Sequence, residues 1–210
     1  MVSTKALVLE SRPCTKRIPK SCSEENEISS NLGYEYFPMS VGQSKIFQVN
    51  ETNYLFSGEV VNTVYQIREE VVDAFLSDQD TSFVIYRYKR ENVDLDWEFL
   101  ETWQARRNTQ QAIVTEGNTP FLKMTFPVFE GKMWDGNRLN ARDEDLYKSD
   151  SLNVPFVIQD VTFDNTLTVI QNDNQDLIVE QDRRYEVYAA GLGLIFRSEL
   201  LLDYCTAEDC

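Results

Sequence analysis

One pattern limits the fold of this chain: short runs in which apolar and polar residues alternate, separated by turn-forming residues. In residues 59–76, EVVNTVYQIREEVVDAFL, alternate positions form a mainly apolar face: Val61, Thr63, Tyr65, Ile67, Glu69 and Val71. A period of two is typical of a half-buried antiparallel strand. A helix competes over residues 67–76, because Ile67, Val71 and Phe75 are spaced by four. The β-branched residues favour the strand.

Similar runs recur along the chain, and residues 156–173 and 176–205 are each typical of a hairpin near the end. We therefore expect an all-β or β-rich α+β fold of about eight to ten strands. They would form a strongly curved antiparallel sheet, as a half-barrel or a sandwich. Residues 134–155 are the longest polar stretch and predict a long loop or one short helix.

Charge is unevenly distributed along the chain. It has 210 residues, with 20 Lys and Arg, 35 Asp and Glu, and a net charge of −15. Residues 1–21 carry five bases and only Glu10 as an acid, a balance of +4, which leaves −19 from Cys22 onward. A chain this acidic is repelled by phosphates, so we expect no nucleic-acid partner.

The chain contains no histidine. This excludes Ser-His-Asp and Cys-His nucleophile systems and zinc or iron bound through histidine. No sequence motif indicates a cofactor.

Residues 1–32 are expected to be a leader and a flexible acidic tether, and residues 33–210 a single β-rich domain. A secretory signal needs an apolar centre of about 7–15 residues, and residues 1–21 offer only ALVL. We interpret residues 1–21 as foreign to the mature protein. Residues 22–31, CSEENEISSN, are polar and acidic, as is typical of a tether.

Four segments resemble uncharacterised lipoproteins of the Bacteroidetes: CSEE at 22–25, YEYFPMSVGQSKIFQV at 34–49, FPVFEGKMWDGN at 126–137 and RYEVYAAGLGLIFRSELL at 184–201. The resemblance implies that Cys22 is the first mature residue and is lipidated. It also implies a bacterial outer-membrane location, on the periplasmic or the cell-surface face. Outer-membrane lipid would be one partner, and an outer-membrane protein another.

The resemblance also bears on the expected state of the other three cysteines. If Cys22 is lipidated and Cys14 is removed, Cys205 and Cys210 remain as an even pair in an oxidising compartment. We expect these two to form a disulfide that closes CTAEDC.

No metal site is expected. Residues 171–176, QNDNQD, come nearest to one, because Asp173 and Asp176 could offer oxygen ligands to a hard cation. A hairpin turn explains the same residues, since the glycine and distal glutamate of a calcium loop are missing.

Aromatic side chains allow two readings. Tyr86, Tyr88, Trp97, Trp103 and Trp134 could line a concave face for sugars or lipids, or form an aromatic core, which we favour.

Three functions remain open. The first is a lipid-anchored, non-enzymatic envelope protein of binding or accessory type, attached to an outer-membrane partner. The second is a carrier of an apolar ligand in a half-open barrel, and the third is a hydrolase that uses two carboxylates. A deep apolar pocket would favour the carrier, and two facing acids with shifted pKa values would favour the hydrolase. A filled interior with an apolar outer patch would favour the first.

Overall fold

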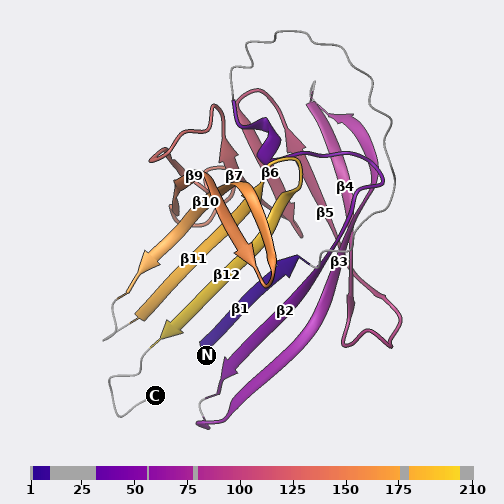
Figure 1. Cartoon of the computed structure of the whole chain (residues 1–210), viewed down its shortest axis with the longest axis vertical. Coiled ribbons are helices and arrows are strands. Elements are labelled where there is room, and N and C mark those ends of the chain that lie inside the picture. The colour runs from indigo at the N-terminus through magenta and orange to yellow at the C-terminus, as the bar shows by residue number, and fades with distance from the viewer. Residues whose placement is uncertain (1, 10–31, 56, 78–79, 176–179, 204–210) are drawn as a thin grey trace.

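The fold is known from a computed structural model that describes residues 2–9, 32–55, 57–77, 80–175 and 180–203 (Figure 1). Twelve strands form one antiparallel sheet, and the described residues add a single turn of 3₁₀ helix, η1 (Tyr34–Tyr36). The expected all-β class with a strongly curved antiparallel sheet is confirmed.

Sheet order differs from chain order at one place. The order is β7-β6-β5-β4-β3-β2-β1-β12-β11-β10-β9-β8. Neighbouring strands are therefore consecutive along the chain, except that β1 lies beside β12. η1 lies in the connection between β1 and β2. The strands are β1 (Val2–Leu9), β2 (Ser44–Tyr54), β3 (Val60–Ser77), β4 (Asp80–Arg90), β5 (Glu98–Arg107), β6 (Gln111–Glu116), β7 (Thr119–Thr125), β8 (Met133–Asp135), β9 (Leu146–Ile158), β10 (Val161–Asn174), β11 (Glu180–Ala189) and β12 (Gly193–Asp203).

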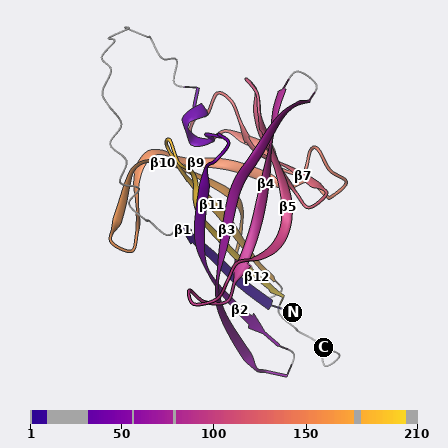
Figure 2. The same ribbon diagram turned by 90° about the vertical axis from the view of Figure 1, so that its right-hand side faces the viewer.

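The sheet curls until its two edges meet. β7 and β8 are the edge strands, yet the Leu122 amide of β7 donates to the Gly136 carbonyl just after β8, at 2.9 Å. The indole Nε1 of Trp134 on β8 donates to the Leu122 carbonyl, also at 2.9 Å. In Figures 1 and 2 the sheet accordingly divides into two arms, one of β4 to β7 and the other of β8 to β12, which β1 to β3 join. Curling therefore satisfies part of the edge backbone that a flat sheet would leave open.

The main core lies between the two arms. Its fully buried members come from strands of both arms, among them Leu122 and Met124 on β7 and Leu167 and Val169 on β10. η1 closes one side of this core, where the Tyr36 hydroxyl donates to Asn153 Oδ1 at 2.7 Å. Burial of these apolar side chains at ~25 cal/mol per Å² is the main force that holds the arms together.

A smaller cluster lies under the β9–β10 hairpin. Ile158, at the end of this hairpin, packs with Val187 and Ala189 of β11 and Ile195 of β12. The hairpin thereby covers part of the face opposite the main core.

Several sequence expectations are confirmed by the strands. Residues 60–77 form strand β3 and not a helix, and both late hairpins are present as β9–β10 and β11–β12. The expected long loop or short helix over residues 134–155 is wrong for most of that stretch, because residues 134–135 belong to β8 and residues 146–155 to β9; only residues 136–145 form a loop. The sheet has twelve strands, more than the eight to ten expected.

The boundary between leader and domain is corrected by β1. We expected residues 1–32 to lie outside the fold, but Val2–Leu9 pair with β2 on one side and β12 on the other. Residues 10–31 lie outside the described residues. The charge of this segment suggested a leader, yet a strand here supplies hydrogen-bond partners to backbone groups of β2 and β12 that would otherwise be open.

Closure of the sheet predicts that Gly136→Ala will destabilise the protein. A Cβ at Gly136 would lie 2.3 Å from Cζ of the Tyr147 ring, and Tyr147 is only 3% exposed. We expect a loss of about 1–3 kcal/mol in the free energy of unfolding, measured by urea denaturation. In a Tyr147→Ala background the same substitution should cost almost nothing. Equal costs in both backgrounds would contradict this packing.

Candidate functional site

The most unusual feature of the interior is a cluster of four charges, which we call the ionic cluster: Lys123 and Glu186, which are buried, and Glu116 and Arg197, which are partly buried. Lys123 Nζ lies 2.8 Å from Glu116 Oε1 and 3.1 Å from Glu186 Oε1. Arg197 Nη2 lies 2.6 Å from Glu186 Oε1 and 3.3 Å from Glu116 Oε1. Two cations and two carboxylates thus neutralise each other between the arms.

Strand register places these charges together. Glu186 of β11 and Arg197 of β12 are directly opposite each other, so their side chains share a face of the sheet. Lys123 stands on β7 between Leu122 and Met124, and all three are buried. Curling of the sheet brings β7 over β11, which puts the Lys123 ammonium against the fully buried Glu186 carboxylate.

The carboxylates of the cluster stay ionised. Burial alone would raise the pKa of Glu116, but the charges of Lys123 and Arg197 lower it to about 2. Burial opposes ionisation of Glu186 in the same way, and the same two cations again hold its pKa below the usual range. The Tyr188 hydroxyl also donates to Glu186 Oε2. Burial, and then the Glu186 charge, raise the pKa of Tyr188 well above its usual range.

A cavity of about 70 Å³ adjoins the ionic cluster. Lys123, Tyr188 and Arg197 line one side, and Lys45 and Trp103 line another. The apolar remainder of the wall includes Phe37, Met39, Ile85, Val114 and Leu194. Organic ligands usually need a pocket of ~300–1,000 Å³, whereas one water needs ~10–15 Å³. The cavity therefore suits a few water molecules or a small ion.

Hydrogen-bond donors around the cavity lack some of their partners. Trp103 Nε1 and Arg197 Nε are buried and have no acceptor among the described residues. Lys45 Nζ reaches only the Leu194 carbonyl, at 3.4 Å, among the hydrogen bonds of the described residues. Burial lowers the pKa of Lys45 to about 8, and nearby Glu69 opposes this only in part. Acceptors in the cavity, such as water oxygens, can thus satisfy these donors.

A second charged group borders this cavity. Arg87 of β4 bonds Glu69 at 3.1 Å and Glu101 at 2.6 Å, and its guanidinium lies 3.6 Å from the centroid of the Trp103 ring. Both carboxylates lie directly opposite Arg87 on the neighbouring strands, Glu69 on β3 and Glu101 on β5.

Two further hollows are lined by both polar and apolar residues. One, of about 240 Å³, is lined by residues of β3 to β7 that include Ser82, Gln104, Arg106 and Thr115. The other, of about 140 Å³, includes Asn172, Asp173, Arg183 and Arg184 among its lining residues. Both volumes are smaller than the ~300 Å³ or more that pockets for organic ligands usually have.

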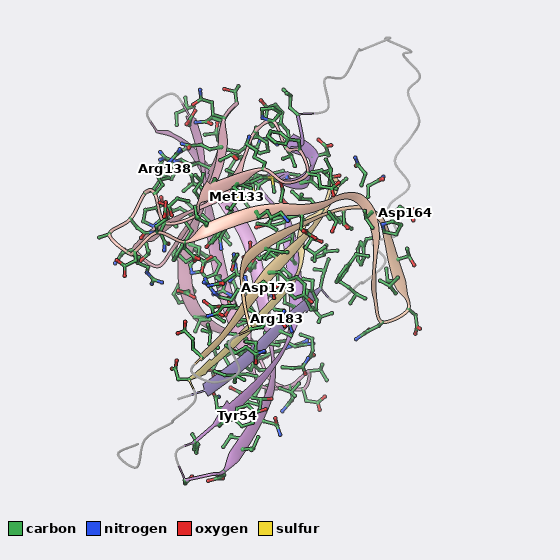
Figure 3. The ribbon with its side chains drawn as sticks, turned by 90° about the vertical axis from the view of Figure 1, so that its left-hand side faces the viewer. Tyr54, Met133, Arg138, Asp164, Asp173 and Arg183 are labelled. Carbon is green, nitrogen blue, oxygen red and sulfur yellow. The ribbon has the colours of Figure 1, made fainter. Side chains whose placement is uncertain are left out.

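The metal candidate Asp173 already has a basic partner. Arg183 Nε on β11 donates to Asp173 Oδ1 on β10 at 3.0 Å, and Figure 3 shows the two side chains next to each other. Hydrogen bonds from Gln175 and Arg183 lower the pKa of this exposed carboxyl. Among the described residues no three Cys, Asp or Glu side chains gather as a metal site. Asp176 lies outside the described residues.

The aromatic residues divide between two locations. Trp103 and Trp134 are buried core residues, at 8% and 7% exposed, as the core interpretation expected. Tyr86 and Phe99 are exposed on β4 and β5, and their ring centroids lie 5.7 Å apart. Tyr88 also contacts Phe99, at 5.9 Å. We call Tyr86, Tyr88 and Phe99 the outer aromatic cluster.

Arginine side chains extend this cluster. The Arg68 guanidinium lies 4.3 Å from the Tyr88 ring centroid and 5.0 Å from that of Trp97. Arg90 lies 4.3 Å from the Trp97 ring. Such stacked arginines keep aromatic rings in place at a surface that water reaches.

The lipidation and disulfide residues lie outside the described part of the chain. These are Cys22, Cys205 and Cys210, and the same holds for Cys14. The expectations about them therefore stay predictions.

Sequence reasoning missed the ionic cluster. The signal it could have used is a charge within an apolar run, as in FLKMTF around Lys123 and RYEVYAA around Glu186. A buried strand that carries such a charge must bring a partner to it.

Comparison with known proteins gives no relative. No family model matches the chain, and neither a curated protein nor a solved structure matches it. Among the described residues no helix is long and apolar enough to cross a membrane.

The ionic cluster predicts a dependence of stability on acid. Because the folded-state pKa of Glu116, about 2, lies below its usual 4.5, its ion pairs stabilise the fold above about pH 5, and this stabilisation is lost as pH falls towards 2. Lys123→Met should cost about 3 kcal/mol at pH 7 and should flatten the fall in stability between pH 5 and 2.

Urea denaturation across this pH range measures both effects. The matched control is Lys148→Met, which removes an exposed ion pair to Asp150 and should change stability by less than about 1 kcal/mol. A Lys123→Met profile parallel to that of the wild type would contradict the neutralising role of Lys123.

The cavity makes a separate prediction for Lys45. Its ammonium should lose its proton near pH 8, whereas an ordinary lysine does so near ~10.4. An NMR titration of the lysine Cε signals measures the midpoint, and Lys45→Arg identifies the signal by its loss. A midpoint above pH 10 would show that the Lys45 ammonium is in contact with bulk water.

Proposed function

We propose that this chain is a lipid-anchored envelope protein of non-enzymatic, binding or accessory type. It is held in a bacterial outer membrane through Cys22 and attached to a protein partner there. Four segments that resemble Bacteroidetes lipoproteins support the anchor and the compartment. The charge change at Cys22 supports it as well, because the chain becomes strongly acidic from that residue onward.

The filled interior is the observation that carries the choice of function. The space between the arms is occupied by the core and the ionic cluster, and the cavity beside them measures about 70 Å³. A carrier of an apolar ligand would need a deep apolar pocket of ~300 Å³ or more. A binding protein was expected to have a filled interior and an apolar patch on its outer surface. The outer aromatic cluster on β4 and β5 supplies such apolar groups.

The hydrolase alternative is less well supported by the same geometry. Glu116 and Glu186 face the same ammonium of Lys123, at 2.8 and 3.1 Å, and their pKa values are both lowered. A general acid in glycoside hydrolysis needs a raised pKa so that it holds a proton near neutral pH. These two carboxylates are instead arranged to stay ionised and paired.

The anchor is tested by labelling lipoproteins in the native host with an alkyne-tagged palmitate. Cys22→Ser should abolish the label on this protein, because the acylated residue is then missing, and should release the protein from the outer membrane. Cys14→Ser is the matched control and should leave the label unchanged. Mass spectrometry of the wild type should find a mature N-terminus at Cys22. An unmodified peptide that runs through Cys22 would refute the anchor.

A further inference from the structure

Strand β1 is held in the sheet differently from every other described strand. It pairs antiparallel with β2 from Val2↔Tyr54 to Leu9↔Phe47, and with β12 from Ser3↔Leu201 to Val8↔Phe196. Figure 1 shows it in indigo between β12 and β2. β2 and β12 are not neighbours in the sheet order, so β1 alone joins them by backbone pairing.

A long stretch of sequence separates β1 from its neighbour β2. The connection from Leu9 to the start of β2 at Ser44 includes residues 10–31, whereas most other neighbouring strands are joined by short turns. A segment of 22 residues can span at most about 70–80 Å, at ~3.3–3.6 Å per residue. The position of β1 therefore depends on its pairing with β2 and β12 and on its side chains.

We call the space that β1 fills between β2 and β12 the groove. Its walls are acidic and aromatic around Lys5. Lys5 lies opposite Glu51 on β2 and Glu199 on β12. Its ammonium is 5.9 Å from the centroid of the Tyr65 ring, and the Tyr65 hydroxyl donates to Glu51 Oε2 at 2.9 Å. Two facing acids and an aromatic ring favour a basic residue at this position.

The groove is apolar further along β1. Leu9 packs against the cluster of Phe47, Val49, Tyr65 and Ile67. Val8 and Leu9 both pack against the cluster under the β9–β10 hairpin. An occupant of this groove therefore needs a basic residue followed by apolar residues three and four positions later.

We propose that the groove between β2 and β12 is a strand-binding site for an extended segment of a partner protein. The segment runs antiparallel to β2 and β12, with a basic residue opposite Glu51 and Glu199 and apolar residues in the places of Val8 and Leu9. Main-chain hydrogen bonds on both sides supply affinity, and these three side-chain positions supply specificity. The inference rests on the proposed function at one point, because processing before Cys22 would separate β1 from the rest of the chain.

The test begins with the full chain, so that the sheet folds with β1 in place. A protease recognition sequence is inserted between residues 10 and 21, and the folded protein is cut. A fluorescent peptide of residues 1–12, MVSTKALVLESR, is then added, and its binding is followed by anisotropy. The cut chain should bind this peptide with a Kd in the micromolar range or below, whereas the uncut chain should bind it at least tenfold more weakly.

Variant peptides test the mode of binding. Lys5→Glu should weaken binding at least tenfold, because it sets a third acid between Glu51 and Glu199. Ala6→Pro should abolish binding, because proline lacks a backbone donor and does not fit between two paired strands. A chain expressed without residues 1–21 gives a second measurement, since the wild-type peptide should raise its melting temperature and the Ala6→Pro peptide should not.

Four outcomes would overturn the proposal. They are equal binding by the cut and uncut chains, equal binding of the wild-type and Lys5→Glu peptides, no uptake of peptide by a cut chain over a day, and dimers of the cut chain formed without peptide. In the last case β2 and β12 of two copies would be pairing with each other. None of these outcomes affects the labelling of Cys22, so failure of this inference is distinguishable from failure of the anchor.

Discussion

The contact between Lys123 and Glu186 is the interaction on which the arrangement of the two arms depends. β7 stands at one edge of the sheet and β11 near the other, yet the two side chains approach to 3.1 Å. Only a sheet that curls back on itself can bring them together. The backbone contact between Leu122 and Gly136 follows from the same curl, and so does the core between the arms.

This interaction explains how the interior holds charged side chains that stay ionised. Each carboxylate of the ionic cluster faces two cations. Their charges favour its ionised form over its protonated form. A buried ion pair is often worth no more to stability than well-packed apolar groups, but the loss of one partner is costly. The cluster therefore specifies how the arms meet.

The sequence was informative about local structure because alternation is a local property. β3 and the two late hairpins could be identified from the spacing of apolar residues in residues 59–76 and 156–205. The ionic cluster could not be predicted, because its members come from four strands and 35 acids offer many pairings. The role of β1 was hidden by charge, since residues 1–21 differ in composition from the sheet that residues 2–9 join.

A double-mutant cycle on Lys123 and Glu186 tests the central claim, that these residues join the two arms across the interior. The free energy of unfolding in urea is measured for the wild type, Lys123→Met, Glu186→Gln and the double variant. The structure predicts that the single losses are non-additive, with a coupling energy of about 1–3 kcal/mol. A coupling energy below about 0.5 kcal/mol would mean that the two side chains do not interact, and would contradict the curled arrangement of the sheet.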